Sequence, residues 1–144
     1  MPKPDDSPHE TIDLKGMREY LSQTEVVFAV LFGSHARGEA DTSSDVDIAL
    51  RFPEGISEVD RFHRRNRIDA DLQAYAVGFV DVSDIESLPT HVAHAALRDG
   101  VRLVGDQQDV DMYKRDVIAE YDESDSQREE ERRGFIDRLS RGDV

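Results

Sequence analysis

The 144-residue sequence contains no cysteine, which excludes disulfides, cysteine-ligated zinc sites and thiol nucleophiles. It has no apolar run near the roughly 20 residues that a membrane-spanning helix needs, and its first ten residues lack the profile of a signal peptide. We therefore expect a cytoplasmic protein without a membrane partner. The length suits one domain with its own core and is short for two.

Basic residues are scarce, and lysine is the scarcest. Asp and Glu number 32 against 18 Lys and Arg, only three of which are lysines, so the net charge is −14. A charge this negative opposes general affinity for nucleic acid, because phosphates are neutralised by basic side chains, and no direct nucleic-acid binding is expected. Two interpretations stay open, an ordinary solvated acidic surface and a halophilic protein whose carboxylates are screened by a salty cytoplasm. The shortage of lysine favours the second, which a requirement for molar salt in folding would test.

Strand and helix patterns alternate along the chain. They predict an α/β (α+β) fold, a small mixed β-sheet with helices packed on one side. The predicted strands are residues 25–32, 45–52, 77–82 and 101–104. The predicted helices are residues 11–23, 57–75 and 89–97 and a long segment after residue 106. In the second helix, Val59, Phe62 and Leu72 are predicted to face the core. The expected organisation is a flexible N-terminus (1–10), one domain (11–106) and a C-terminal helical extension (107–144).

The segment LFGSHARGEADTSSDVDIAL carries the strongest chemical signal. Gly33 ends an apolar strand, and its missing Cβ lets a phosphate approach its N–H, while Ser34 adds a hydroxyl donor. A helix starting here would aim further N–H groups at the same anion. Asp45 and Asp47 lie two positions apart on the next predicted strand, so both carboxylates point to one spot. Such close like charges repel unless a cation lies between them, and Mg²⁺ prefers oxygen ligands of this kind.

The third predicted strand supplies a third carboxylate. Asp81 alternates with apolar neighbours and so points away from the core face, as the first two aspartates do. Asp84 has the opposite parity and is the weaker candidate. Two metal ions held in such a site, about 3.5–4 Å apart, clamp the attacking and leaving oxygens of a phosphoryl transfer. A Gly-Ser turn or an Asp-x-Asp pair alone is commonplace in an acidic chain, but their combination at this spacing and parity favours a functional site.

The pattern G-S-x10-D-x-D, from Gly33-Ser34 to Asp45-x-Asp47, resembles the signature of the polymerase-β-like nucleotidyltransferase superfamily. Over residues 25–106 the chain is more narrowly similar to minimal nucleotidyltransferase (MNT) domains, the MntA-type antitoxins of HepT/MntA toxin–antitoxin pairs. The resemblance implies a polymerase-β-like nucleotidyltransferase fold. It also implies nucleotide contacts at Gly33, Ser34 and Arg37, and catalytic and metal-binding roles for Asp45, Asp47 and Asp81.

The function that this resemblance implies is an enzymatic antitoxin. ATP would be the substrate, two Mg²⁺ ions the cofactors, and a tyrosine of a HepT-like HEPN-family ribonuclease toxin the acceptor, in a hetero-oligomer with that toxin. Two alternatives stay open. One is a nucleotidyltransferase for a small molecule such as an aminoglycoside, although the polar residues after Asp106 are too few for a substrate domain. The other is an antitoxin that masks its partner without catalysis, which the three aspartates disfavour.

Three weaker features have competing interpretations. The basic island RFHRRNR, residues 61–67, is better explained by pairing with nearby acids than by contact with the partner or its RNA. The apolar cluster of Phe135, Ile136 and Leu139 follows a highly charged run and is either ordinary packing or a docking helix for a partner. His35, beside the Gly-Ser turn, is expected to be exposed.

Overall fold

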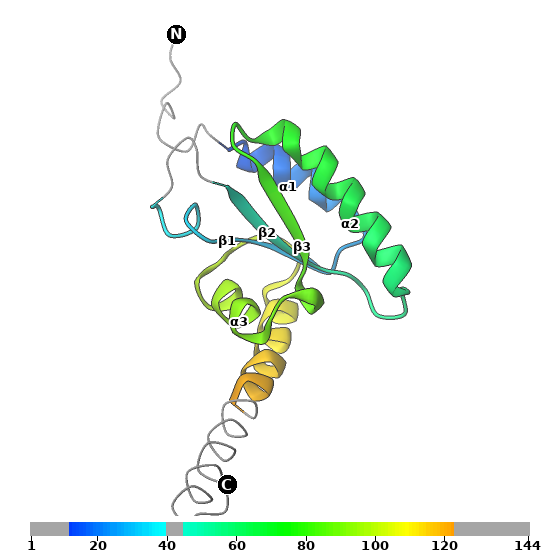
Figure 1. The fold of residues 1–144 in the computed structure, drawn as a ribbon, viewed down its shortest axis with the longest axis vertical. Helices are drawn as coiled ribbons and strands as arrows, with labels where there is room; N and C mark the ends of the chain where they lie inside the picture. The colour runs from blue at the N-terminus through cyan, green and yellow to red at the C-terminus, as the bar shows by residue number, and fades with distance from the viewer. Residues whose placement is uncertain (1–11, 40–44, 123–144) are drawn as a thin grey trace, which may run out of the picture.

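The computed structural model of the chain describes residues 12–39 and 45–122. Its strands are β1 (Phe28–Phe32), β2 (Val46–Arg51), β3 (Val80–Asp84) and β4 (Val101–Val104). They form one sheet in the order β3-β2-β1-β4. The strand β1 is antiparallel to β2 and to β4, whereas β2 and β3 are parallel. The predicted mixed sheet is therefore confirmed, and β3 lies at one edge of it (Figure 1).

Within the described residues, four α-helices accompany the sheet, three of which are labelled in Figure 1. They are α1 (Leu14–Ser22), α2 (Glu58–Leu72), α3 (Thr90–Asp99) and a helix over residues 107–122, with short 3₁₀ turns at η2 (Gln73–Tyr75) and η3 (Ile85–Ser87). Side chains fix where the first two helices begin: Asp13 accepts a hydrogen bond from the N–H of Gly16, and Ser57 accepts one from the N–H of Asp60. Helix α2 is the crossover that parallel strands require between β2 and β3.

The helices cover both faces of the sheet, which corrects the prediction that they pack on one side. One face buries Ala29, Leu31, Ile48 and Leu50 with residues of α1 and α2. The other buries Phe28, Val30 and Ala49 with residues of α3 and with Val110 and Val117 of the helix at 107–122. Figure 1 shows α1 and α2 on one side of the strands and α3 with this last helix on the other. The reason lies in β1, whose first four residues are all buried, so both of its faces need cover.

Helix α2 differs most from its predicted packing. Leu72 is fully buried as expected, and Ile68 lies beside it in the core. Val59 and Phe62, however, are 65% and 58% exposed. The helix thus packs on the sheet through its C-terminal half, and the prediction that Val59 and Phe62 face the core is wrong.

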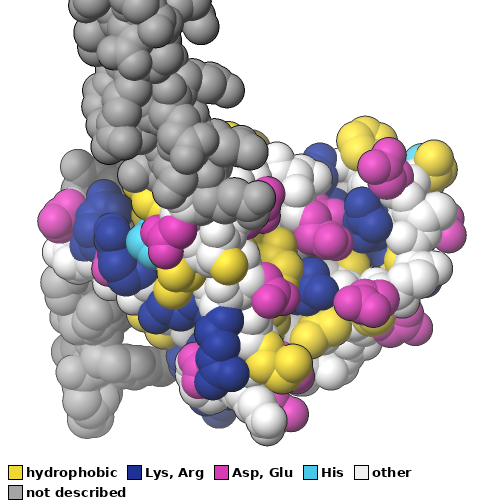
Figure 2. All heavy atoms as spheres, turned by 90° about the horizontal axis from the view of Figure 1, so that it is seen from below, with side chains coloured by type: hydrophobic (Ala, Val, Ile, Leu, Met, Phe, Trp, Pro, Cys, Tyr) yellow, Lys and Arg dark blue, Asp and Glu magenta, His cyan; other side chains and the backbone are white. Residues whose placement is uncertain are grey.

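Three of the four arginines of the basic island on α2 pair with nearby acids. Its ion pairs are Arg61–Asp84, Arg64–Glu25 and Arg65–Asp69. The preferred interpretation, pairing with nearby acids, is confirmed. Figure 2 shows acidic and basic side chains intermixed on the face seen there.

Within the described residues, no helix combines the length and the apolar character needed to cross a membrane. The predicted flexible terminus at 1–10 and the apolar cluster of Phe135, Ile136 and Leu139 lie outside the described residues.

Candidate active site

The strand register brings the predicted site residues together. Asp47 of β2 pairs with Asp81 of β3 on one side and with Phe32 of β1 on the other. Gly33 follows directly after Phe32, and Asp45 precedes β2 with the same parity as Asp47. Because paired residues in a sheet point to the same face, the carboxylates of Asp47 and Asp81 are neighbours. Asp47 therefore stands between Asp81 and the Gly-Ser turn.

The Gly-Ser turn lies directly against Asp47. Gly33 has a φ of +79°, a left-handed conformation that favours glycine. A Cβ at this position would lie 2.5 Å from Oδ2 of Asp47, so only glycine leaves the carboxylate in its place. Residues 34–38 form a turn rather than a helix, closed by the N–H of Arg37, which donates to the carbonyl of Gly33 at 3.2 Å.

The surroundings of Asp47 disfavour its ionised form. Its pKa is raised above the usual value, first by burial and then by repulsion from Asp81 and Asp45. The nearby His35 and Arg37 act in the opposite direction without cancelling the effect. An additional cation at this position would therefore favour the ionised form of Asp47.

The turn itself contributes two basic side chains. His35 is half-buried, not exposed as expected, and it interacts electrostatically with Asp47. Arg37 pairs with Glu39, with 3.1 Å between Nε and Oε2, and both side chains are largely exposed. Exposed pairs contribute only about 0–1 kcal/mol, so the guanidinium can exchange Glu39 for a phosphate at little cost.

The donor set fits Mg²⁺ bound together with a nucleotide. Asp45, Asp47 and Asp81 offer only hard carboxylate oxygens, and repulsion from Asp81 and Asp45 contributes to the raised pKa of Asp47. Among the residues that the structure describes, however, no three His, Asp or Glu side chains form a group that could hold a metal ion. Mg²⁺ is usually held by one or two carboxylates plus substrate phosphates, so the nucleotide would complete the coordination.

Asp84 has a structural role, because its side chain binds helix α2 and the turn that follows β3. It is buried, its Oδ2 accepts a 2.9 Å hydrogen bond from Nε of Arg61, and its Oδ1 accepts one from the N–H of Glu86 at 3.0 Å. Both carboxylate oxygens are thus engaged away from Asp47, in agreement with its ranking as the weaker candidate.

Comparison with known proteins connects this geometry to a family. The family model described as "Polymerase beta, Nucleotidyltransferase" matches residues 15–109, a span that contains both the Gly-Ser turn and the three aspartates. The chain belongs to this nucleotidyltransferase family. The prediction drawn from Gly33-Ser34 and Asp45-x-Asp47 is confirmed at the level of family and fold.

More specific relatives are toxin–antitoxin proteins. The nucleotidyltransferase is 24% identical over 116 residues to "Protein adenylyltransferase MntA" of Shewanella oneidensis, covering 81% of this chain and 79% of the relative. A solved toxin–antitoxin complex with AMP-PNP superposes with a TM-score of 0.65 at 23% identity, over 89% of this chain and 98% of that one. A complex of a tri-AMPylated Shewanella oneidensis HEPN toxin with an MNT antitoxin superposes with a TM-score of 0.57 at 20% identity, over 88% and 98%.

Three side chains that hold the backbone around Asp81 in place were not predicted from the sequence. Gln73 bonds both peptide groups of Val80: its Oε1 accepts from the N–H at 2.9 Å, and its Nε2 donates to the carbonyl at 2.6 Å. One turn earlier on α2, Oδ2 of Asp69 accepts from the N–H of Val82 at 3.1 Å. One turn before that, Nη1 of Arg65 donates to the carbonyl of Val82 at 2.6 Å. We call Arg65, Asp69 and Gln73 the edge latch. They fix the backbone on both sides of Asp81 in the manner of a neighbouring strand.

The only sequence signal for the edge latch is its spacing. Arg65, Asp69 and Gln73 follow one another at intervals of four, so they lie on one side of α2. That spacing is shared by many solvated helix faces, and it does not reveal that the partner is a strand edge.

Replacing Gln73 with leucine is expected to lower the free energy of unfolding by about 2 kcal/mol. The reason is that the N–H and C=O of Val80 lose their partner while leucine shields them from water. Urea denaturation measures the change. Gln107→Leu is the matched control, because Gln107 is exposed and its side chain donates to Asp111, one turn on in the same helix. A shift within about 0.5 kcal/mol is expected there. Equal shifts for the two variants would contradict a role for the latch.

Proposed function

We propose that the protein is an antitoxin that uses ATP and Mg²⁺ to transfer AMP to a tyrosine of a HEPN-family ribonuclease toxin. One observation carries the proposal: Asp47, whose charge is uncompensated, lies in register between Asp81 and the left-handed Gly33. Support comes from the curated adenylyltransferase relative and from the solved complexes that contain AMP-PNP or an AMPylated HEPN toxin.

The proposed roles follow from position. The N–H of Gly33 and the hydroxyl of Ser34 would donate to the triphosphate, with Arg37 as a further phosphate contact. Asp45 and Asp47 would hold Mg²⁺, which when bound neutralises the charge that develops on the phosphates. Asp81, at the side remote from Gly33, would orient the incoming hydroxyl and take up its proton.

The transfer itself is a single displacement at the α-phosphorus of ATP. The tyrosyl oxygen forms a bond to this phosphorus while the bond to the bridging oxygen of pyrophosphate breaks, and the hydroxyl proton passes to Asp81 and then to water. The products are an AMP-tyrosine ester and pyrophosphate. The protein contributes mainly position and electrostatic stabilisation.

The test uses as acceptor the protein encoded beside this chain's gene, which the proposal expects to carry a HEPN domain. Incubation with α-labelled ATP and Mg²⁺ is expected to label that protein on tyrosine, as located by mass spectrometry, and to abolish its ribonuclease activity. A neutralised but unlabelled partner would favour masking without catalysis. Labelling of an aminoglycoside instead would favour a small-molecule enzyme, and a neighbouring gene for an unrelated protein would count against the toxin assignment.

The cellular setting is a separate proposal. A cytoplasm of high salt, inferred from the excess of acids and the shortage of lysine, stays a prediction.

A further inference from the structure

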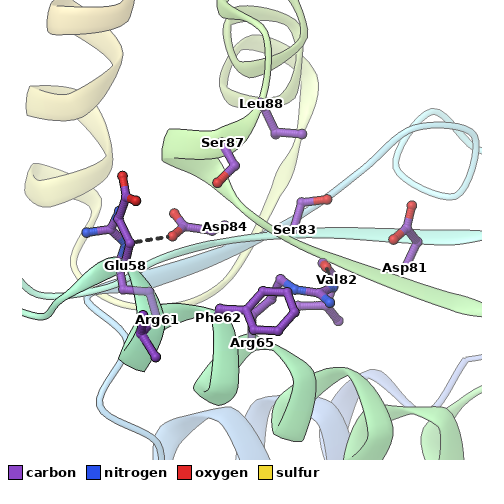
Figure 3. A pocket seen from close by; sticks show the side chains of 11 residues that line it. Glu58, Arg61, Phe62, Arg65, Asp81, Val82, Ser83, Asp84, Ser87 and Leu88 are labelled. Atoms are coloured by element: carbon purple, nitrogen blue, oxygen red, sulfur yellow. Dashed lines mark hydrogen bonds and ion pairs between the residues drawn. The ribbon is translucent and has the colours of Figure 1, made fainter.

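A groove runs between helix α2 and the edge strand β3. Its volume is about 690 Å³, within the roughly 300–1,000 Å³ range of ligand pockets. Figure 3 shows Asp81 at one end, Glu58 and Arg61 at the other, Phe62 on the helix side of the strand and Leu88 on the opposite side. The groove therefore begins at one of the candidate catalytic carboxylates and leads away from it.

The order of the strands determines which reactant can occupy this groove. Gly33 follows β1, Asp47 lies on β2 and Asp81 lies on β3, and the three strands are neighbours in that order. The Gly-Ser turn, where the nucleotide would bind, and the groove are thus on opposite sides of Asp47. In an in-line displacement the attacking and leaving oxygens lie on opposite sides of the reacting phosphorus. With pyrophosphate at the turn, the attacking hydroxyl arrives from the groove.

The walls of the groove are suited to a protein segment. Phe62 and Val59 are 58% and 65% exposed, in a chain whose mean hydropathy is −0.62. Leu88 adds a partly buried apolar side chain across the groove. Exposed apolar side chains rimmed by charge are typical of interaction surfaces. They have no role in the core, and a nucleotide at Gly33 lies on the far side of Asp47.

The charges of the groove favour a basic occupant. Arg61 is paired with Asp84, and Arg65 donates to the carbonyl of Val82. Glu58 and Asp81, in contrast, make no ion pair with any of the described residues. The charged groups of the groove that remain available to a bound segment are therefore the carboxylates of Glu58 and Asp81, which attract basic side chains.

The edge latch excludes one common mode of peptide binding. Extended peptides often add to a free sheet edge through backbone hydrogen bonds. At β3, the outward N–H and C=O groups of Val80 and Val82 are already bonded to Gln73, Asp69 and Arg65. An occupant must therefore be recognised through its side chains.

We propose that the groove between α2 and β3, the acceptor groove, binds the tyrosine-bearing segment of the HEPN partner. The tyrosine hydroxyl lies at Asp81, an apolar or aromatic neighbour packs on Phe62 and Val59, and a basic neighbour approaches Glu58. The inference rests on the proposed function, because it names the acceptor side of the same site.

Kinetics with the HEPN partner test the groove. The double variant Phe62→Ala/Val59→Ala is expected to raise the KM for the partner about tenfold or more, as removal of interface anchors does, with the KM for ATP unchanged. Phe62→Leu, which keeps an apolar side chain, should restore most of the affinity. Met112→Ala is the control, since Met112 is 55% exposed and lies on the helix at 107–122, away from the groove. An unchanged KM for the double variant would overturn the inference.

A crosslink separates this inference from the proposed function. With p-benzoylphenylalanine in place of Phe62, irradiation of the complex is expected to link the partner within a few residues of the acceptor tyrosine. The same group in place of Met112 should not reach that segment. Because crosslinking needs no AMP transfer, a partner that is bound but never labelled would refute the proposed function alone. Crosslinks from position 62 to another part of the partner, or none, would refute the acceptor groove.

Discussion

Replacing Asp47 with asparagine is expected to lower nucleotidyl transfer by at least about 10³-fold and, at neutral pH, to stabilise the fold. Activity is expected to fall because an amide would not supply the negative charge with which Asp45 and Asp47 would hold Mg²⁺. Stability rises because burial and repulsion from Asp81 and Asp45 disfavour the ionised carboxyl, as its raised pKa indicates. A residue that lowers the stability of the fold and lies at the centre of the site is typical of a functional position.

The pH dependence of this stabilisation has a definite sign. A raised pKa in the folded state means that the folded protein binds the proton of Asp47 more tightly than the unfolded chain does. This contribution is fully present below the ordinary pKa of 3.8 and is lost as the pH rises through the raised value. The stability advantage of Asp47→Asn over the native protein should therefore be near zero in strong acid and grow as the pH rises.

Thermal unfolding between acidic and neutral pH, in the absence of divalent ions, measures this advantage. Glu19→Gln, which removes a carboxylate from the exposed face of α1, is the control for net charge. If both variants gain the same stability, relief of the overall negative charge explains the result. A destabilised Asp47→Asn would contradict the electrostatic account of the site.

Replacing Gly33 with alanine is expected to reduce transfer by about 100-fold, since small misplacements at an active site have effects of this size. The new Cβ would lie 2.5 Å from Oδ2 of Asp47 and would push the carboxylate out of line with Asp81. The left-handed backbone adds a loss of roughly 1–2 kcal/mol in stability.

Gly55→Ala separates these two effects. Gly55 also has a positive φ, of +87°, but a Cβ there meets no atom within 4 Å. The Gly55→Ala variant should show the same loss of stability, because alanine is strained in a left-handed backbone conformation at either position. Its activity should stay within about twofold of the native value. Transfer rates and urea denaturation of both variants check the prediction. Equal activities would show that the contact between Gly33 and Asp47 does not matter for catalysis.

Much of the site could be predicted from local sequence, because its geometry depends on parity. The alternation around Asp45, Asp47 and Asp81 correctly placed them on the face opposite Val46, Val80 and Val82, and it separated Asp84 from them. The central position of Asp47 could not be predicted in this way. It depends on the order β3-β2-β1, which is decided by contacts between strands distant in the sequence.

The errors also have physical causes. Helical spacing suggested that Val59 and Phe62 face the core, but a periodic pattern does not show where a helix passes beyond the sheet. The helices were expected on one side from the alternation of strands and helices along the chain, which does not show how many faces of a strand are buried. Phe28 and Val30 of β1 are buried on the face opposite Ala29 and Leu31, so both faces need cover. The bonds from Asp69 and Gln73 to β3 join polar groups that hydropathy treats as surface.

The edge latch has a consequence for how the protein behaves in a crowded cell. A bare strand edge is a template on which other chains can pair and aggregate, and β3 would be one without Arg65, Asp69 and Gln73. The side chains that fix Asp81 therefore also keep this edge from joining molecules into larger assemblies. Loss of these side chains is expected to have two effects: the carboxylate of Asp81 shifts, and the edge of β3 becomes free to pair with other chains. We therefore expect loss of these hydrogen bonds to affect both aggregation and the position of Asp81.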